Sequence, residues 1–74
     1  MANEAIKQLL DKFHYHEMMD RTSMLMQTCE QHLLQHPVAK IELEVKQNIE
    51  TAIEYLWKAY QLTGEISDKR FNNE

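Results

Sequence analysis

Apolar side chains recur along most of this chain at the three- and four-residue spacing of an amphipathic α-helix. The chain has one proline, Pro37, and one glycine, Gly64, so no helix-breaking residue interrupts its first half. We therefore predict a first helix over about residues 3–35. Asn3 is expected to cap this helix, because its side chain can accept a hydrogen bond from the first free backbone amides.

The second half of the chain predicts a second long helix over about residues 38–63. Residues 36–37 are expected to form the turn, because Pro37 disfavours helical geometry at the residue before it and suits the first position of a new helix. Gly64 is expected to end the second helix, with residues 64–74 as a tail. The expected fold is all-α, a single domain over residues 1–74 that forms an antiparallel helical hairpin.

The apolar faces of the two predicted helices do not match each other. On the second helix one stripe is expected to face the first helix, while Trp57 lies outside this stripe; its members are Ile41, Val45, Ile49, Ala52, Ile53, Leu56 and Tyr60. The first helix carries two apolar groups about 150° apart. One contains Met18, Met19, Leu25, Met26, Cys29 and Leu33, and the other contains Ile6, Leu9, Leu10 and Phe13. Either the first helix breaks near residues 14–17, or several copies of the chain associate.

Length and charge narrow the possible functions. A chain of 74 residues buries little apolar surface on its own, and the single Cys29 cannot form an internal disulfide. A metal ion or self-association is therefore expected to supplement the fold, and self-association is the simpler assumption. The net charge of −4 argues against binding DNA or RNA backbones. No apolar run is long enough for a membrane span, and the N-terminus lacks the pattern of a signal peptide. We therefore expect an intracellular protein that contacts no membrane.

Candidate binding residues are concentrated between positions 13 and 22. Tyr15 offers a ring for stacking and Arg21 a forked donor for phosphate, which together suit a nucleotide. His16, Asp20 and Arg21 are expected on one side of the helix. Together with Thr22, these residues form the candidate site. The alternative interpretation is an exposed polar face with an ion pair at Asp20.

Other site chemistry has weaker support in this sequence. His32 and His36 have the i, i+4 spacing that grips a metal ion, but no further zinc pattern accompanies them, and we expect no metal site. Cys29 lies on an apolar stripe, where a thiol is usually inert. A phosphate-binding glycine loop is impossible with one glycine. We therefore predict a protein that is not an enzyme and has no cofactor.

Four methionines on the first helix support a different function. Met18, Met19, Met24 and Met26 resemble an adaptable interaction surface, although methionine at helical spacing more often fills a core. With Trp57, this surface suits docking on another protein. The alternative function is therefore a small protein-interaction module that binds its partner through the methionine-rich helical face.

The segments YHEMMDRTSMLMQ, HLLQHP and AYQLTGE together carry a family resemblance. Over about residues 15–65 the sequence resembles the phage anti-CBASS cyclic-nucleotide sponges, whose helical hairpin is shared with part of the anti-Thoeris sponges. The resemblance implies a phage-encoded homohexamer in the host bacterial cytoplasm. Such a protein sequesters the cyclic oligonucleotide messengers of CBASS antiphage immunity and does not hydrolyse them.

The resemblance also implies roles for individual residues. In that family cyclic dinucleotides lie between protomers, where an aromatic residue near the start of the hairpin stacks on a base, and Tyr15 matches this residue. Cyclic trinucleotides use separate pockets around a threefold axis, where Arg70 is the candidate for a phosphate contact. The dinucleotide site of the family uses a lysine on the first helix, but this chain has no lysine between Lys12 and Lys40. The expected ligands are therefore cyclic trinucleotides such as cyclic tri-adenylate, and less strongly dinucleotides of the cyclic GMP-AMP type.

Overall fold

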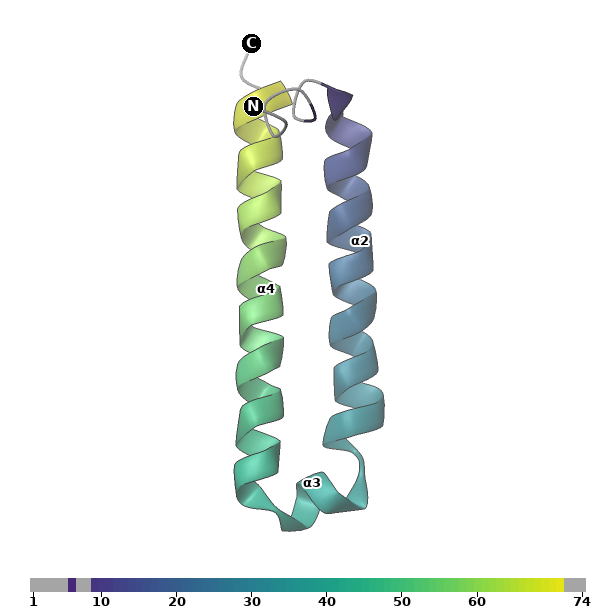
Figure 1. Cartoon of the computed structure of the whole chain (residues 1–74), viewed down its shortest axis with the longest axis vertical. Coiled ribbons are helices and arrows are strands. Elements are labelled where there is room, and N and C mark those ends of the chain that lie inside the picture. The colour runs from purple at the N-terminus through teal and green to yellow at the C-terminus, as the bar shows by residue number, and fades with distance from the viewer. Residues whose placement is uncertain (1–5, 7–8, 72–74) are drawn as a thin grey trace.

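The chain is all-helical, as its sequence predicted. The computed structural model describes residue 6 and residues 9–71. These residues form helix α2 (Lys12–Thr28), the π-helical segment η1 (Cys29–Leu34), the short helix α3 (Pro37–Ile41) and the long helix α4 (Leu43–Phe71). Helices α2 and α4 lie side by side and run in opposite directions, with α3 at the end where the chain turns (Figure 1). The molecule is elongated, with extents of 50 × 26 × 14 Å.

The first predicted helix is interrupted at Leu10 and Asp11, which is not where a break was expected. Ile6 and Leu9 are helical, but Leu10 and Asp11 are not, and α2 starts at Lys12. Asp11 has extended backbone angles, and its carboxylate accepts a hydrogen bond from the His14 backbone N–H at 3.1 Å. Aspartate is one of the residues most favoured at the N-cap of a helix. The predicted break near residues 14–17 is therefore wrong, since those residues are helical, while the predicted cap at Asn3 lies outside the described residues.

The turn between the long helices contains two features that the sequence did not predict. The first helix widens into the π-helical η1, and the second is divided because Glu42 leaves helical geometry at φ −92° and ψ 95°. The predicted role of Pro37 is confirmed. It occupies the first turn of α3, and His36 before it is extended at ψ 140°. The His36 ring caps this helix, because its Nδ1 accepts from the Val38 N–H at 3.1 Å.

The predicted end of the second helix at Gly64 is wrong. Gly64 lies inside α4, which continues to Phe71 and so includes most of the predicted tail; residues 72–74 lie outside the described part. A Cβ atom at position 64 would lie 3.2 Å from the Met19 Cε atom. The missing side chain therefore serves the close approach of α4 to α2 and not a left-handed cap. Lys69 and Arg70 in the last turn suit the negative end of the helix dipole.

We expect Gly64→Ala to stabilise the protein slightly. Alanine in a helix interior is favoured over glycine by about 1 kcal/mol. Against this gain, the Met19 methyl must move by a few tenths of an ångström, which a flexible thioether side chain permits. Urea unfolding at a fixed protein concentration measures the difference. Gly64→Leu serves as the contrast and should destabilise. A clear loss of stability in Gly64→Ala would show that the Met19 side chain cannot move away from the added methyl group.

The helix-helix seam buries few side chains completely. Ala39 is the one buried apolar residue among those described, and the largest fully buried side chain is Ser67. The predicted stripe on the second helix is correct in part. Ile49, Ile53, Leu56 and Tyr60 are half-buried, whereas Ile41, Val45 and Ala52 are exposed.

The single chain exposes more surface than a compact protein of its size. Its accessible surface is 6168 Å², whereas a compact monomer of this mass exposes about 4,800 Å². The radius of gyration is 16.1 Å, against about 11 Å for a compact chain of this length. None of the described helices, however, combines the length and the apolar character needed to cross a membrane.

Candidate functional site

Tyr15 and Arg21, the two residues predicted to recognise a nucleotide, line the same groove. This groove has a volume of about 400 Å³ and lies between the first half of α2 and the later half of α4. Its lining residues are Leu10, His14, Tyr15, Glu17, Met18, Arg21 and Thr63. Most of the exposed lining is apolar, so the groove offers both a surface for a flat ring and a cation at its edge. We call it the Tyr15 groove.

The Arg21 guanidinium is held loosely at the edge of this groove. Its Nη2 atom lies 3.6 Å from Oε1 of Glu17, one helical turn earlier. The Arg21 side chain is 71% exposed, and such surface pairs contribute little to stability. The guanidinium can therefore leave the carboxylate and bind a phosphate with little loss of free energy. Glu17 itself lines the groove and opposes an anion, so binding depends on Arg21 turning away from it.

An aromatic contact joins Tyr15 to the end of α4. The Tyr15 and Phe71 rings meet edge to face, with centroids 5.5 Å apart and planes at 68°. The Arg70 guanidinium carbon lies 5.5 Å from the centre of the Phe71 ring. Tyr15 and Arg70, distant in sequence, are thereby brought to the same end of the molecule. The sequence analysis did not identify Phe71 as a site residue. Helical spacing could have indicated it, because Phe71 lies four positions after the buried Ser67 and therefore on the same face of α4.

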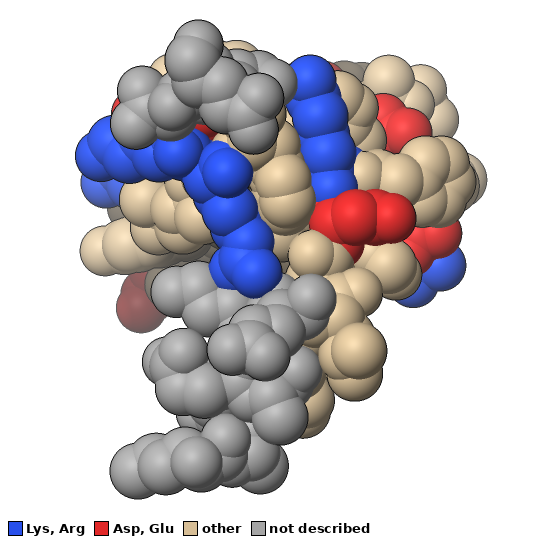
Figure 2. All heavy atoms as spheres, turned by 90° about the horizontal axis from the view of Figure 1, so that it is seen from above, with Lys and Arg blue, Asp and Glu red and all other residues tan. Residues whose placement is uncertain are grey.

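The end of the molecule where α2 begins and α4 ends is rich in cationic side chains. Figure 2 shows several Lys and Arg side chains on this end, with acidic groups beside them. Lys12 in the first turn of α2 and Lys69 and Arg70 in the last turn of α4 supply positive charge here. A chain of net negative charge thus carries local cations next to the Tyr15 groove.

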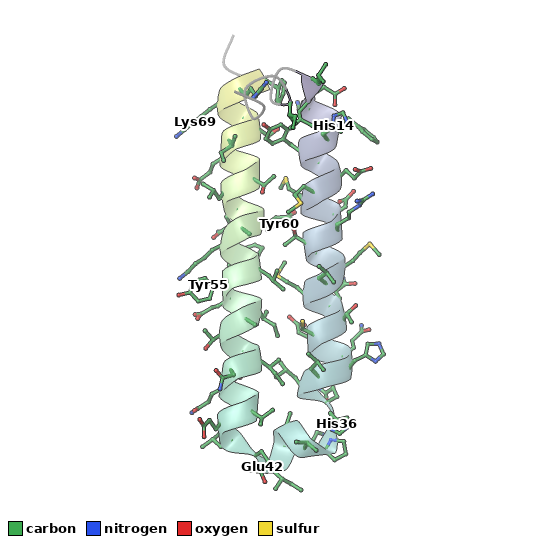
Figure 3. The ribbon with its side chains drawn as sticks, viewed as in Figure 1. His14, His36, Glu42, Tyr55, Tyr60 and Lys69 are labelled. Atoms are coloured by element: carbon green, nitrogen blue, oxygen red, sulfur yellow. The ribbon has the colours of Figure 1, made fainter. Side chains whose placement is uncertain are left out.

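His16 and Asp20 do not share a groove with Arg21. They line a separate groove of about 210 Å³ together with Met19 and Tyr60. Figure 3 shows Tyr60 on α4, turned toward α2. The expected alignment of His16, Asp20 and Arg21 on one side is therefore wrong for Arg21. Positions 20 and 21 differ by about 100° around a helix, which is enough to place them in different grooves.

Thr22 lies outside both grooves. The side chain is buried, with 4% of its surface exposed, and its hydroxyl donates to the Met18 carbonyl oxygen at 2.8 Å. This placement makes Thr22 part of the seam between α2 and α4. Its predicted contact with a ligand would require the two helices to separate.

The start of α2 fixes the orientation of Tyr15. Asp11 and His14 form a reciprocal cap, in which the His14 Nδ1 accepts from the Asp11 N–H at 3.1 Å. The His14 backbone N–H that donates to the Asp11 carboxylate lowers the pKa of that carboxyl below its ordinary value of 3.8, and the nearby His14 ring adds to the effect. Because Tyr15 follows directly, this cap sets the first turn from which its ring projects (Figure 3 labels His14).

The lowered pKa of Asp11 predicts a loss of stability in acid. A carboxyl whose pKa is lower in the folded state stabilises the fold above its unfolded pKa, and this contribution disappears as the pH falls through the folded value. Asp11→Asn keeps a capping oxygen but does not titrate. Thermal melts of both proteins, followed by circular dichroism, should show a wild-type advantage at pH 6 that shrinks below about pH 4. An advantage that persists unchanged to pH 2 would contradict this role.

The histidine pair with metal-ligand spacing is divided by the turn. His32 lies in η1, and His36 uses its Nδ1 to cap α3. Among the described residues, no three His, Cys, Asp or Glu side chains gather closely enough to hold a metal ion.

Comparisons with protein-family models, curated proteins and solved structures give no match to this chain.

Proposed function

We propose that this protein is a phage-encoded sponge for cyclic oligonucleotides, which sequesters the messengers of CBASS immunity in the host bacterial cytoplasm without hydrolysing them. The observation that carries the proposal is the Tyr15 groove, where one ring and one guanidinium line the same opening. An aromatic ring stacks on any base, and a forked guanidinium matches a phosphate. The family resemblance of residues 15–65 points to the same ligand class.

Several copies of the chain are required to complete such a site. One groove supplies one ring and one accessible guanidinium, whereas a cyclic trinucleotide has three bases and three phosphates. A homohexamer of two-helix hairpins with one threefold axis would place three copies around each end of that axis, so that three copies of Tyr15 and Arg21 meet one ligand. Arg70 at the same end of the molecule is a further phosphate contact. The large exposed surface of the single chain supports association.

Calorimetry with cyclic tri-adenylate and with cyclic GMP-AMP tests the proposal. We expect both the affinity and the number of sites to favour the trinucleotide, because the chain has no lysine between Lys12 and Lys40. The bound ligand is then released by denaturing the protein and weighed by mass spectrometry. Recovery of the intact cyclic ligand fits a sponge. Recovery of linear product would contradict sequestration without hydrolysis, and no heat with either ligand would contradict the ligand class.

A second candidate function rests on the exposed methionines. Met18 and Met24 are 53% and 65% exposed, Leu25 lies beside them, and a shallow groove of about 320 Å³ runs between Arg21 and Thr28. Such a surface fits docking on a host protein. Met24→Gln leaves the Tyr15 groove intact. It should therefore abolish host-protein binding under the second function and leave nucleotide binding unchanged under the first.

A further inference from the structure

Helix α4 carries two apolar seams. The inner seam faces α2, and its members alternate in steps of four and three residues: Ile49, Ile53, Leu56, Tyr60, Thr63 and Ser67. The outer seam follows the same rule on an adjacent side of the helix and consists of Val45, Ala52, Tyr55, Ala59, Leu62 and Ile66, with Asn48 in the remaining position. A repeat of this kind is the signature of a helix that packs against another helix along its length.

Most side chains of the outer seam are exposed in the single chain, whereas Ala59 is half-buried. Tyr55 is 65% exposed, Leu62 is 55% exposed, and Val45 and Ile66 are also exposed. Tyr55 and Lys69 project from the side of α4 that faces away from α2 (Figure 3). Asn48, the polar member, donates its side-chain amide to the Glu44 carbonyl oxygen of its own helix at 2.8 Å.

We propose that the outer seam binds the outer seam of a second copy, with the two α4 helices antiparallel about a twofold axis level with position 57. This proposal rests on the assembly of several copies that the proposed function requires, but not on any nucleotide. In this register large residues meet small ones. Tyr55 faces Ala59 of the second copy, and Ala52 faces Leu62 of the second copy, which lets the side chains interdigitate.

The charges at the ends of the outer seam match only in the antiparallel direction. Glu44 lies in the first turn of α4 and Lys69 in the last. Lys69 continues the spacing of the seam and Glu44 adjoins Val45, so antiparallel packing places each beside the other on the second copy. Parallel packing would instead bring Lys69 to Lys69 and Glu44 to Glu44. Antiparallel packing also opposes the two helix dipoles.

The single chain as a whole has enough extra exposed surface for a contact of standard size. It exposes 6168 Å², about 1,400 Å² more than a compact monomer of this mass. A standard interface buries about 800 Å² on each partner. Exposed surface remains elsewhere, including Trp57 at 47%, for contacts that build a larger assembly.

Sedimentation equilibrium of the nucleotide-free full chain tests the outer seam. Leu62→Lys should weaken the contact by about 100-fold or more, because both copies lose a buried leucine. Gln61→Lys introduces the same charge at the next, exposed position, so the mass should stay at the wild-type value. A wild-type protein that stays monomeric over about a 100-fold range of protein concentration would overturn the proposal. A Leu62→Lys protein whose assembly has the wild-type mass would overturn it as well.

If Leu62→Lys and Gln61→Lys both lower the mass of the assembly, the added charge alone accounts for the loss. Charge reversal at the ends of the seam then tests the direction of packing. Glu44→Lys and Lys69→Glu should each weaken association by a few-fold, and the protein carrying both changes should recover it, since each new charge meets its opposite on the second copy. No recovery in the double variant would overturn the antiparallel arrangement. These outcomes are independent of the sponge function, because a protein that associates through this seam without binding nucleotide would contradict only the latter.

Discussion

Tyr15→Ala is expected to weaken binding of cyclic tri-adenylate by about 100-fold or more, since base stacking on an aromatic ring is worth about 1 to 3 kcal/mol per base and three copies act in one site. Calorimetry at one ionic strength measures this change. Tyr15→Phe keeps the ring and should bind nearly as well as wild type. The Tyr15 hydroxyl takes no part in the stacking that carries the prediction.

The contact between Tyr15 and Phe71 makes a second readout necessary. Tyr15→Ala also removes the edge-to-face contact with Phe71, so a loss of affinity could follow from a loosened end of the molecule. The mass of the assembly should therefore be measured for each variant. Phe71→Leu removes the same ring contact and leaves Tyr15 in place. If Phe71→Leu and Tyr15→Ala weaken binding equally, Tyr15 is a structural residue and does not stack on the ligand.

Arg21→Gln is expected to weaken trinucleotide binding to a similar degree. A hydrogen bond to a charged group contributes about 1.5 to 3 kcal/mol, and a threefold site loses three of them. The remaining affinity should also depend less steeply on salt, because fewer cations meet the phosphates. Titrations between low and physiological salt measure both effects. Arg21→Lys keeps the charge without the planar fork and should fall between wild type and Arg21→Gln.

The smaller groove lined by His16 and Asp20 provides the matched controls for Arg21. His16→Ala and Asp20→Asn alter the smaller groove with Tyr60 and leave the Tyr15 groove as it is. Both variants should bind cyclic tri-adenylate with nearly the wild-type affinity. Equal losses from Arg21→Gln and Asp20→Asn would mean that the Tyr15 groove is not the ligand site.

The sequence predicted the helices better than it predicted their ends. Helical spacing and the position of Pro37 are strong local signals, and both led to correct features. The start at Lys12 depends on an unusual cap, in which His14 occupies the position where glutamate is the usual partner of Asp11. The role of Gly64 could not be predicted from the sequence near it. Its role follows from contact with Met19 on another helix, which no local pattern reveals.

The candidate site was predicted in part because its residues lie close in sequence. Tyr15 and Arg21 lie on one helix, so their types and spacing could be judged directly. The separation of Arg21 from Asp20 depends on the rotation of α2 against α4, and the burial of Thr22 depends on the same packing. Val45 and Ala52 were assigned to the inner stripe for a related reason. Both seams of α4 have helical spacing, and only the position of α2 tells them apart.

Native mass spectrometry of the protein, alone and with a mixture of cyclic di- and trinucleotides, tests the sponge function most directly. It reports the number of chains and the number of bound ligands in one spectrum. We predict a hexamer that gains a small whole number of nucleotide masses and retains cyclic trinucleotides more strongly than dinucleotides. A monomer or dimer that carries no nucleotide at any ligand concentration would contradict the proposed function.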